Sequence, residues 1–235
     1  MRVLALDTST REGSVALVEN DRVIVERAGD GARSHAERLP GDLMRLLGER
    51  RLDFEAVDLY AVVAGPGSFT GLRIGLATMQ GLAFVHGRRI VAVSALEALA
   101  HVAAMRLAPG SVVASWINAY RREVFSALYQ TADAEPFSAA RLVEIEAPAV
   151  GPPAGVLNRW KTRRVAAFIG DGAAEYAAMI DPDRVLRPTP LLAGPAGLMA
   201  VVRAQTHAVD PAGVQPIYVR RPDAETARER ERAQP

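Results

Sequence analysis

The feature that most constrains this chain is a glycine-rich segment at residues 65–81. It follows an apolar run at residues 57–64, which suits a buried strand, and it continues into a stretch of helical composition at residues 69–86. Glycines after a strand let the backbone turn sharply and approach a neighbouring segment closely. The segment therefore predicts a strand–loop–helix unit in an α/β fold.

This segment does not match the two familiar nucleotide-binding loops. A Walker loop needs lysine followed by serine or threonine after its last glycine, whereas Gly71 is followed by Leu72 and Arg73. A dinucleotide-binding loop needs the spacing G-x-G-x-x-G, whereas the glycines that start at Gly65 have the spacing G-x-G-x-x-x-G. We therefore assign neither motif.

The helix after the loop carries small residues on one side. Gly71, Gly75 and Thr78 recur at spacings of four and three residues, which places them on one face. Each glycine costs about 1 kcal/mol relative to alanine in a helix, so the face needs a reason. Such a face either packs tightly on the protein's own sheet or binds a partner subunit, and the spacing leaves both interpretations open.

Strands and helices are expected to alternate through the first part of the chain. Besides the strand before the glycine loop, β-prone segments lie at residues 2–7, 13–18, 22–27 and 90–93, and a helix is expected at residues 95–107. The second and third segments are expected to form a hairpin. Together the segments predict a βββαβαβα unit with a mostly parallel sheet.

A helix is expected between the first three strands and the glycine loop. Ser34 stands three residues before Glu37, which is the spacing of a capping box, and leucines recur at helical spacing as far as Gly48. Pro40 interrupts the segment, and an interior proline costs about 3 kcal/mol. We therefore expect a kink, or a short turn before the main helix.

A second lobe is expected after the turn at residues 108–110. A hairpin is expected from residues 111–117 and 123–129, strands at 141–145, 165–169 and 217–219, and helices at 173–180 and 196–207. The predicted domains are residues 1–107, residues 108–221 and a charged flexible tail at 222–235. Both lobes begin with a hairpin and later place a glycine between a strand and a helix, which suggests a duplicated architecture.

Composition limits the chemistry. The chain has no cysteine, which excludes disulfides, thiol catalysis and cysteine–metal sites. Its net charge of +1 creates no strong field toward nucleic acid. No apolar run is long enough to span a membrane and no secretory signal is visible, so we expect a cytoplasmic protein. The four histidines are scattered and form no evident serine–histidine–acid order.

Several motifs together resemble the TsaB (YeaZ) family, a subunit of the bacterial machinery that makes threonylcarbamoyladenosine in tRNA. The resemblance covers nearly the whole chain and rests on GPGSFTGLRIGLAT at residues 65–78, supported by residues 4–9, 33–39, 93–100, 170–173 and 216–220. Gln80 departs from the lysine that the family often has there. The resemblance implies an α/β actin-like ATPase (ASKHA) fold of two lobes with mixed sheets flanked by helices, the second lobe reduced.

The resemblance also implies partners. A chain of this kind is expected to be a non-catalytic subunit that docks on the catalytic paralogue TsaD, with TsaE as a further partner. Alone it is expected to form a homodimer, to reach tRNA only through the complex, and to bind no membrane. ATP or ADP at the interface with the partner is compatible with the resemblance. The expected interface residues are Ser34, His35, Leu39, Leu43, Leu46, Leu47, Thr70, Gly71, Ile74, Gly75, Thr78 and Leu82.

The catalytic paralogue carries an H-x-x-x-H metal motif after the strand that follows the glycine helix. Two histidines four residues apart on a helix can hold one ion. Ala95 and Leu99 stand at the matching positions here, and neither side chain can ligate a metal. His101 is out of register with this spacing. We therefore expect no metal site and no catalytic residue in this segment.

Two acidic turns are the candidates for nucleotide binding. Asp7, Thr8 and Ser9 end the first strand, where actin-like folds place an acidic residue that faces phosphates. The alternative, which we favour, is a turn whose side chains bond their own backbone. Gly170 and Asp171 precede a helix that Asp171 is suited to cap, and a phosphate role is the weaker interpretation.

Three competing functions stay open at this point. The chain could act alone as a nucleotide hydrolase or as a glycoprotease-like peptidase, or it could bind tRNA directly. The basic residues Arg159, Lys161, Arg163 and Arg164 form a cluster that we interpret first as a solvated surface. No activated nucleophile or water is recognisable for hydrolysis.

Overall fold

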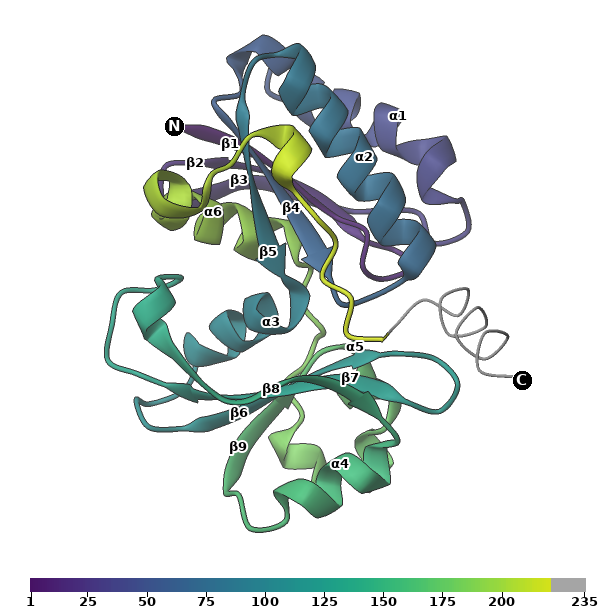
Figure 1. Cartoon of the computed structure of the whole chain (residues 1–235), viewed down its shortest axis with the longest axis vertical. Coiled ribbons are helices and arrows are strands. Elements are labelled where there is room, and N and C mark those ends of the chain that lie inside the picture. Colours follow the sequence, from purple (N-terminus) through teal and green to yellow (C-terminus); the bar gives the residue numbers. More distant parts are fainter. Residues whose placement is uncertain (221–235) are drawn as a thin grey trace, which may run out of the picture.

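Five strands form the first sheet of the computed structural model, which describes residues 1–220 (Figure 1). Their order across the sheet is β3-β2-β1-β4-β5. They are β1 (Arg2–Asp7), β2 (Ser14–Glu19), β3 (Arg22–Ala28), β4 (Leu59–Gly65) and β5 (Arg89–Ser94). β2 pairs antiparallel with both β3 and β1, β1 pairs parallel with β4, and β4 pairs parallel with β5. The predicted hairpin and the predicted parallel pairing are both confirmed.

Three long helices cover the two faces of this sheet. α1 (His35–Gly48) and α2 (Phe69–Val85) cover one face, and α6 (Ala193–His207) covers the other (Figure 1). α1 continues through Pro40 as one helix, so the expected short turn before the main helix is wrong, while the kink at Pro40 stays a prediction. Pro40 and Ala36 are both exposed, so water can bind the Ala36 carbonyl that proline leaves without a helix partner.

The second sheet has four strands in the order β8-β7-β6-β9. The strands are β6 (Val112–Asn118), β7 (Val124–Thr131), β8 (Leu142–Gly151) and β9 (Val165–Ile169), and the helices of this lobe are α4 (Pro153–Trp160) and α5 (Asp171–Glu175). The predicted β6–β7 hairpin is confirmed. β8 is longer than predicted, and α4 had no counterpart in the prediction because its eight residues include a proline and a glycine.

The two sheets repeat one topology. β1, β2 and β3 form an antiparallel meander, and so do β6, β7 and β8. β4 pairs parallel with β1, as β9 pairs parallel with β6. The second sheet has no counterpart of β5, so the second lobe is the reduced one. This pair of mixed sheets confirms the predicted duplication and the predicted fold class.

The prediction that each lobe is one contiguous stretch of the sequence is wrong. α6 and the segment after it pack on the first sheet, because α6 contacts β1, β2, β4 and β5. The N-lobe is therefore completed by residues 193–220, and the boundary at residue 107 describes only where the chain first leaves it. The tail predicted at 222–235 lies outside the described residues.

α3 (Ala95–Ala104) lies between the two sheets and links them (Figure 1). Glu97 on α3 forms an ion pair of 2.6 Å with Arg203 on α6. Burial by itself raises the pKa of Glu97, but the hydrogen bonds from His101 and Arg203 outweigh burial and lower that pKa to about 2. This ion pair ties α3 to the N-lobe.

Short 3₁₀ helices make up the remaining regular structure: η1 (Phe54–Ala56), η2 (Ala139–Arg141), η3 (Ala177–Met179), η4 (Pro182–Arg184) and η5 (Pro211–Gly213). Within residues 1–220, no helix combines the length and the apolar character that a membrane span needs.

Candidate functional site

The glycine face of α2 is turned toward the interior. A Cβ on Gly71 would overlap the carbonyl oxygen of Thr8 and lie 3.2 Å from the His35 ring. A Cβ on Gly75 would overlap Oγ1 of Thr8, whose Cβ and Cγ2 would both be 3.1 Å away. These glycines therefore let α2 approach the end of β1. The expectation that Gly71 and Gly75 form an exposed docking face is wrong for this chain.

The leucines of α1 also face the interior and are core residues. Four of the predicted interface side chains, Leu39, Leu43, Leu46 and Leu47, are each 1% exposed and pack in the cluster between α1, α2 and the first sheet. Burying each contributes about 2 kcal/mol to folding. Because the chain's own core covers them, the expectation that they contact a partner is wrong.

His35 also belongs to the interior. Its Nε2 lies 3.0 Å from the Thr10 carbonyl oxygen, and its Nδ1 lies 2.8 Å from the Arg38 guanidinium. Burial and the Arg38 charge lower the pKa of His35. Ser34, by contrast, is exposed and forms the predicted capping box with Glu37. Of the two, only Ser34 is open to a partner.

The exposed side of α2 is apolar near its C-terminal end. Phe84 is 77% exposed and Val85 is 76% exposed, which is unusual for large apolar side chains. Ala77 and Gly81 are exposed on the same helix, and a Cβ on Gly81 would meet nothing within 4 Å. We call Ala77, Gly81, Phe84 and Val85 the outer α2 face.

The other predicted residues of α2 lie beside this face. Thr70 is exposed, while Ile74, Thr78 and Leu82 are half-buried, and Ile74 and Leu82 pack against the α1–α2 core. On α1, Met44 is 65% exposed. Sequence periodicity picked out Ala77 and Gly81 as a small pair but missed Phe84 and Val85, because it selected small residues. Two exposed apolar neighbours at the end of a helix were the available signal.

The segment at residues 211–220 runs along α2 and returns to the second lobe (Figure 1). The Gln80 amide nitrogen donates to the carbonyl oxygens of Pro211 (2.7 Å) and Val214 (3.1 Å). Ile217 donates its backbone N–H to the Ala64 carbonyl oxygen at 2.8 Å but forms no strand, so the strand predicted at residues 217–219 is wrong. The departure at Gln80 therefore has a structural role in holding this segment.

A cleft of about 480 Å³ lies between the lobes and contains both acidic turns. Asp7 and Asp171 line it, together with Leu99 and Tyr120. Burial, helped by the nearby Asp171 carboxylate, outweighs the lowering effect of the hydrogen bonds from Ser9 and raises the pKa of Asp7 to about 6. Burial also raises the pKa of Asp171. The cleft thus brings together Asp7 and Asp171, one from each lobe, whereas the other predicted nucleotide-binding residues, Thr8, Ser9 and Gly170, do not line it.

Each aspartate also bonds the backbone beside it. Asp7 accepts a hydrogen bond of 2.8 Å from the Ser9 N–H, as expected for a turn that bonds itself. Asp171 accepts from Asn118 (3.0 Å) and from Gly172 (2.8 Å). The N-cap of α5 is Gly170 rather than Asp171, because Gly170 has the positive φ of 114° that the turn into the helix requires.

The positions that match the paralogue's metal histidines are apolar and buried. Ala95 is 0% exposed and Leu99 is 1% exposed, and Leu99 lies in the wall of the cleft near Asp7 and Asp171. The carboxylate and nitrogen donors that α3 carries are already engaged, because Glu97 accepts from Arg203 through both oxygens and His101 Nε2 lies 3.4 Å from the same guanidinium. The donor set on α3 does not fit a metal of that kind.

Tyr120 stands at the mouth of the cleft on the β6–β7 turn, and it is 58% exposed. Sequence reasoning recognised the turn but not this side chain. The basic cluster lies far from it, at the end of α4, where Arg159 pairs with Glu146 at 2.9 Å. Lys161, Arg163 and Arg164 are exposed there, and a solvated surface stays the favoured interpretation over a contact with RNA.

Comparison with known sequences gives a consistent family. Residues 23–147 match the family model described as TsaD, tRNA N6-adenosine threonylcarbamoyltransferase. A Haemophilus influenzae relative named tRNA threonylcarbamoyladenosine biosynthesis protein TsaB is 30% identical over 94% of this chain and 94% of its own length. An uncharacterised Mycobacterium tuberculosis protein is 33% identical over 94% of this chain and 93% of its own length.

Solved structures agree with the sequences. YeaZ from Pseudomonas aeruginosa is 31% identical, with a TM-score of 0.71 over 92% of this chain and 99% of that chain. The activator of 2-hydroxyisocaproyl-CoA dehydratase from Clostridium difficile, solved with bound ADPNP, is 11% identical with a TM-score of 0.51 over 93% of this chain and 100% of that chain. At that identity the second likeness shows the actin-like fold alone. With the first likeness and the sequence matches, the chain belongs to the TsaB (YeaZ) family.

Proposed function

We propose that this chain is a non-catalytic subunit of the machinery that makes threonylcarbamoyladenosine in tRNA, and that it acts by binding the catalytic subunit TsaD. Membership of the TsaB family and the names of its relatives support the pathway. The observation that carries the binding role is the outer α2 face with its two large apolar side chains, Phe84 and Val85, in water.

The outer α2 face has the features of a helix-packing surface. Ala77 and Gly81 are small and lie one helical turn apart, so a partner helix can approach their backbone closely. Phe84 and Val85 follow at the next turn and supply apolar area. Covering such side chains removes apolar surface from water, which favours association. Thr70, Ile74, Thr78 and Leu82 border this surface and stay predicted contacts.

The chemistry of the cleft supports a role through a partner. TsaD is expected to supply the metal ligands, because α3 of this chain has Ala95 and Leu99 at those positions. Modification of the substrate tRNA then takes place only in the complex, in the cytoplasm. TsaE is a further proposed partner, and self-association through the same face is proposed for the chain alone.

An adenine nucleotide near the interface with the partner is part of this proposal. Asp7 and Asp171 are the residues that would face its phosphates. Both carboxylates already accept backbone hydrogen bonds, so a cation would have to be shared between them and the phosphates. Calorimetric titration of the purified complex with ADP and Mg²⁺ tests this part separately from docking.

The docking role is tested with Phe84→Glu in the full chain. A carboxylate in place of Phe84 would have to be desolvated in the interface, so we expect binding to TsaD to weaken at least tenfold by light scattering and calorimetry. The same change at Met179, which is 47% exposed in the second lobe, is the matched control and should leave binding unchanged.

Circular dichroism and thermal melting establish that both variants are folded. If Phe84→Glu is folded and binds TsaD as tightly as the unaltered chain, the outer α2 face is not the docking surface. If Met179→Glu weakens binding equally, the surface lies elsewhere or the effect is one of net charge.

A further inference from the structure

A second cavity, of about 370 Å³, lies at the N-terminal end of α2. It shares only Tyr120 with the cleft that contains Asp7 and Asp171. Three parts of the chain form its walls: the loop and first turn of α2, the β6–β7 hairpin, and the segment that ends at Arg220. Phe84 and Val85 are at the other end of α2, so this cavity lies apart from the outer α2 face, and of the predicted contacts bordering that face only Thr70 lines it.

The cavity is lined by aromatic rings that are partly open to solvent. Phe69 is 39% exposed and stacks on Tyr218, which is 38% exposed, with 5.3 Å between the ring centroids. Tyr120 at the rim is 58% exposed. Phe125 forms the deeper wall. A cavity of this volume, mostly apolar and with a few polar groups at its rim, has the character of a small-ligand site.

Two arginines accompany these rings. The Arg73 guanidinium carbon lies 3.9 Å from the Phe69 ring centroid, and Nε of Arg73 donates to the Tyr218 hydroxyl at 3.1 Å. The Arg220 guanidinium carbon lies 5.5 Å from the Phe125 centroid. Arg220 pairs with Glu123, whereas within residues 1–220 Arg73 forms no ion pair with a carboxylate. The rim therefore carries positive charge beside exposed aromatic faces.

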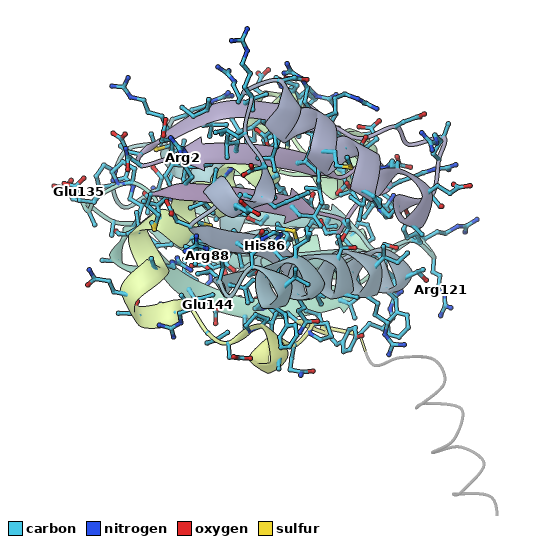
Figure 2. All side chains as sticks on the ribbon, turned by 90° about the horizontal axis from the view of Figure 1, so that it is seen from above. Arg2, His86, Arg88, Arg121, Glu135 and Glu144 are labelled. Carbon is cyan, nitrogen blue, oxygen red and sulfur yellow. The ribbon has the colours of Figure 1, made fainter. Side chains whose placement is uncertain are left out.

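The turn that presents Tyr120 has an unusual backbone. Tyr120, Arg121 and Arg122 have φ values of 56°, 54° and 61°, so three successive residues other than glycine are left-handed. Each costs about 1–2 kcal/mol, and such conformations persist only where the surroundings impose them. The Asn118 carboxamide accepts the Tyr120 N–H at 2.8 Å, which helps to hold the turn. Figure 2 shows Arg121, next to Tyr120, near the end of α2 that is farther from His86.

From these observations we propose that this cavity binds a single ribonucleotide, with its base against Phe69 and Tyr120 and its phosphate at Arg73. Every nucleobase has a flat π-face, and proteins bind unstacked bases by placing them on aromatic rings with arginine nearby. The cationic rim favours this anionic ligand over an apolar peptide side chain. The ribonucleotide is either free or an unpaired nucleotide of an RNA, since the chemistry at the site is the same.

The first experiment measures fluorescence anisotropy of the full chain with a labelled single-stranded RNA hexamer at low salt. A hexamer of abasic ribose phosphates serves as the matched probe, and unlabelled AMP is the competitor. We expect the RNA hexamer to bind and the abasic hexamer to bind at least tenfold more weakly. Competition by AMP at concentrations near its own Kd identifies a free nucleotide as sufficient, and its failure to compete identifies an RNA strand.

Substitutions then assign the binding to this cavity. Phe69→Leu removes a ring that lines this cavity and not the cleft, and Tyr120→Ala removes the exposed ring at the rim; we expect roughly fivefold to hundredfold weaker binding in each, as is typical of base–aromatic stacking. Tyr120→Phe keeps the π-face and should retain the affinity. Met105→Ala removes another exposed apolar side chain, which is 55% exposed and follows α3, and should have no effect.

Three results would overturn the proposal. They are the absence of binding to both RNA and AMP, equal binding of the abasic hexamer, or unchanged affinity in Phe69→Leu. Because Tyr120 lies outside the outer α2 face, binding to TsaD can be measured on the same variants. A failure of the nucleotide site therefore leaves the docking proposal standing, and the reverse also holds.

Discussion

Gly75 of α2 lies directly against Thr8 at the end of β1, with no room between them for a methyl group. Thr8 is fully buried and β-branched, so its side chain cannot rotate away without a clash elsewhere. This contact fixes how closely the helix approaches the sheet. It also means that a carboxylate introduced at Gly75 would test folding rather than docking.

Gly75→Ala is expected to lower the free energy of unfolding by about 1–3 kcal/mol, because the added methyl group overpacks the contact with Thr8. Gly81→Ala on the same helix is the matched control. A Cβ there meets nothing within 4 Å, so the higher helix propensity of alanine should raise stability by about 1 kcal/mol. Urea denaturation of the two variants measures both values, and shifts of the same sign would contradict the assignment of the two sides of α2.

Asp7→Asn is expected to stabilise the protein at neutral pH and to lose that effect in acid. The folded-state pKa of Asp7 is about 6, above its ordinary value of 3.8, so the folded protein holds this proton more tightly than the unfolded chain. The contribution of Asp7 to stability is then fully present below about pH 4 and is lost as the pH rises through 6. The difference of about two pKa units between the folded and unfolded states corresponds to about 3 kcal/mol in the free energy of unfolding.

Asparagine cannot ionise, yet its carbonyl oxygen can still accept the Ser9 N–H. The difference in unfolding free energy between Asp7→Asn and the unaltered chain should therefore grow from near zero at pH 4 to a maximum above pH 7. Denaturation at several pH values measures this difference. A difference that stays constant with pH would show that Asp7 does not titrate in this range.

Gln80→Leu is expected to loosen residues 211–220 while α2 remains folded. The side-chain amide of Gln80 binds two backbone carbonyl groups, and leucine of similar size would leave both without that donor. Loss of the two bonds should cost about 1–3 kcal/mol locally. Faster amide hydrogen exchange at residues 211–220, with unchanged exchange in β1 and β4, is the expected result. Equal protection in both proteins would contradict the role assigned to Gln80.

Much of the fold followed from local patterns. The two hairpins, the strand before Gly65 and the capping box at Ser34 are local features, and each is where the sequence predicts it. The turn expected at Pro40 is absent, because the helix propensity of proline gives an energetic cost without saying whether water can bind the carbonyl group that proline leaves without a partner. The lobe boundary was misplaced because nothing local says that α6 returns to the first sheet rather than the second.

The candidate site was less predictable than the fold. Helical spacing groups Gly71 and Gly75 correctly on one face but cannot say whether that face meets the sheet or the solvent. Phe84 and Val85, the apolar residues at the end of α2, are exposed to water. A pattern that assigns apolar residues to the core gives no role to exposed ones. The cavity beside Tyr120 is built from three distant segments, so only the folded chain brings its walls together.

The return of α6 to the first sheet has a consequence for the order of folding during synthesis. One face of that sheet is covered by residues 193–207, so it stays open while the ribosome is still translating the second lobe. The second lobe, whose strands lie between residues 112 and 169, has all its partners earlier and can form first. The N-terminal strands are made first, but their lobe is the last to close.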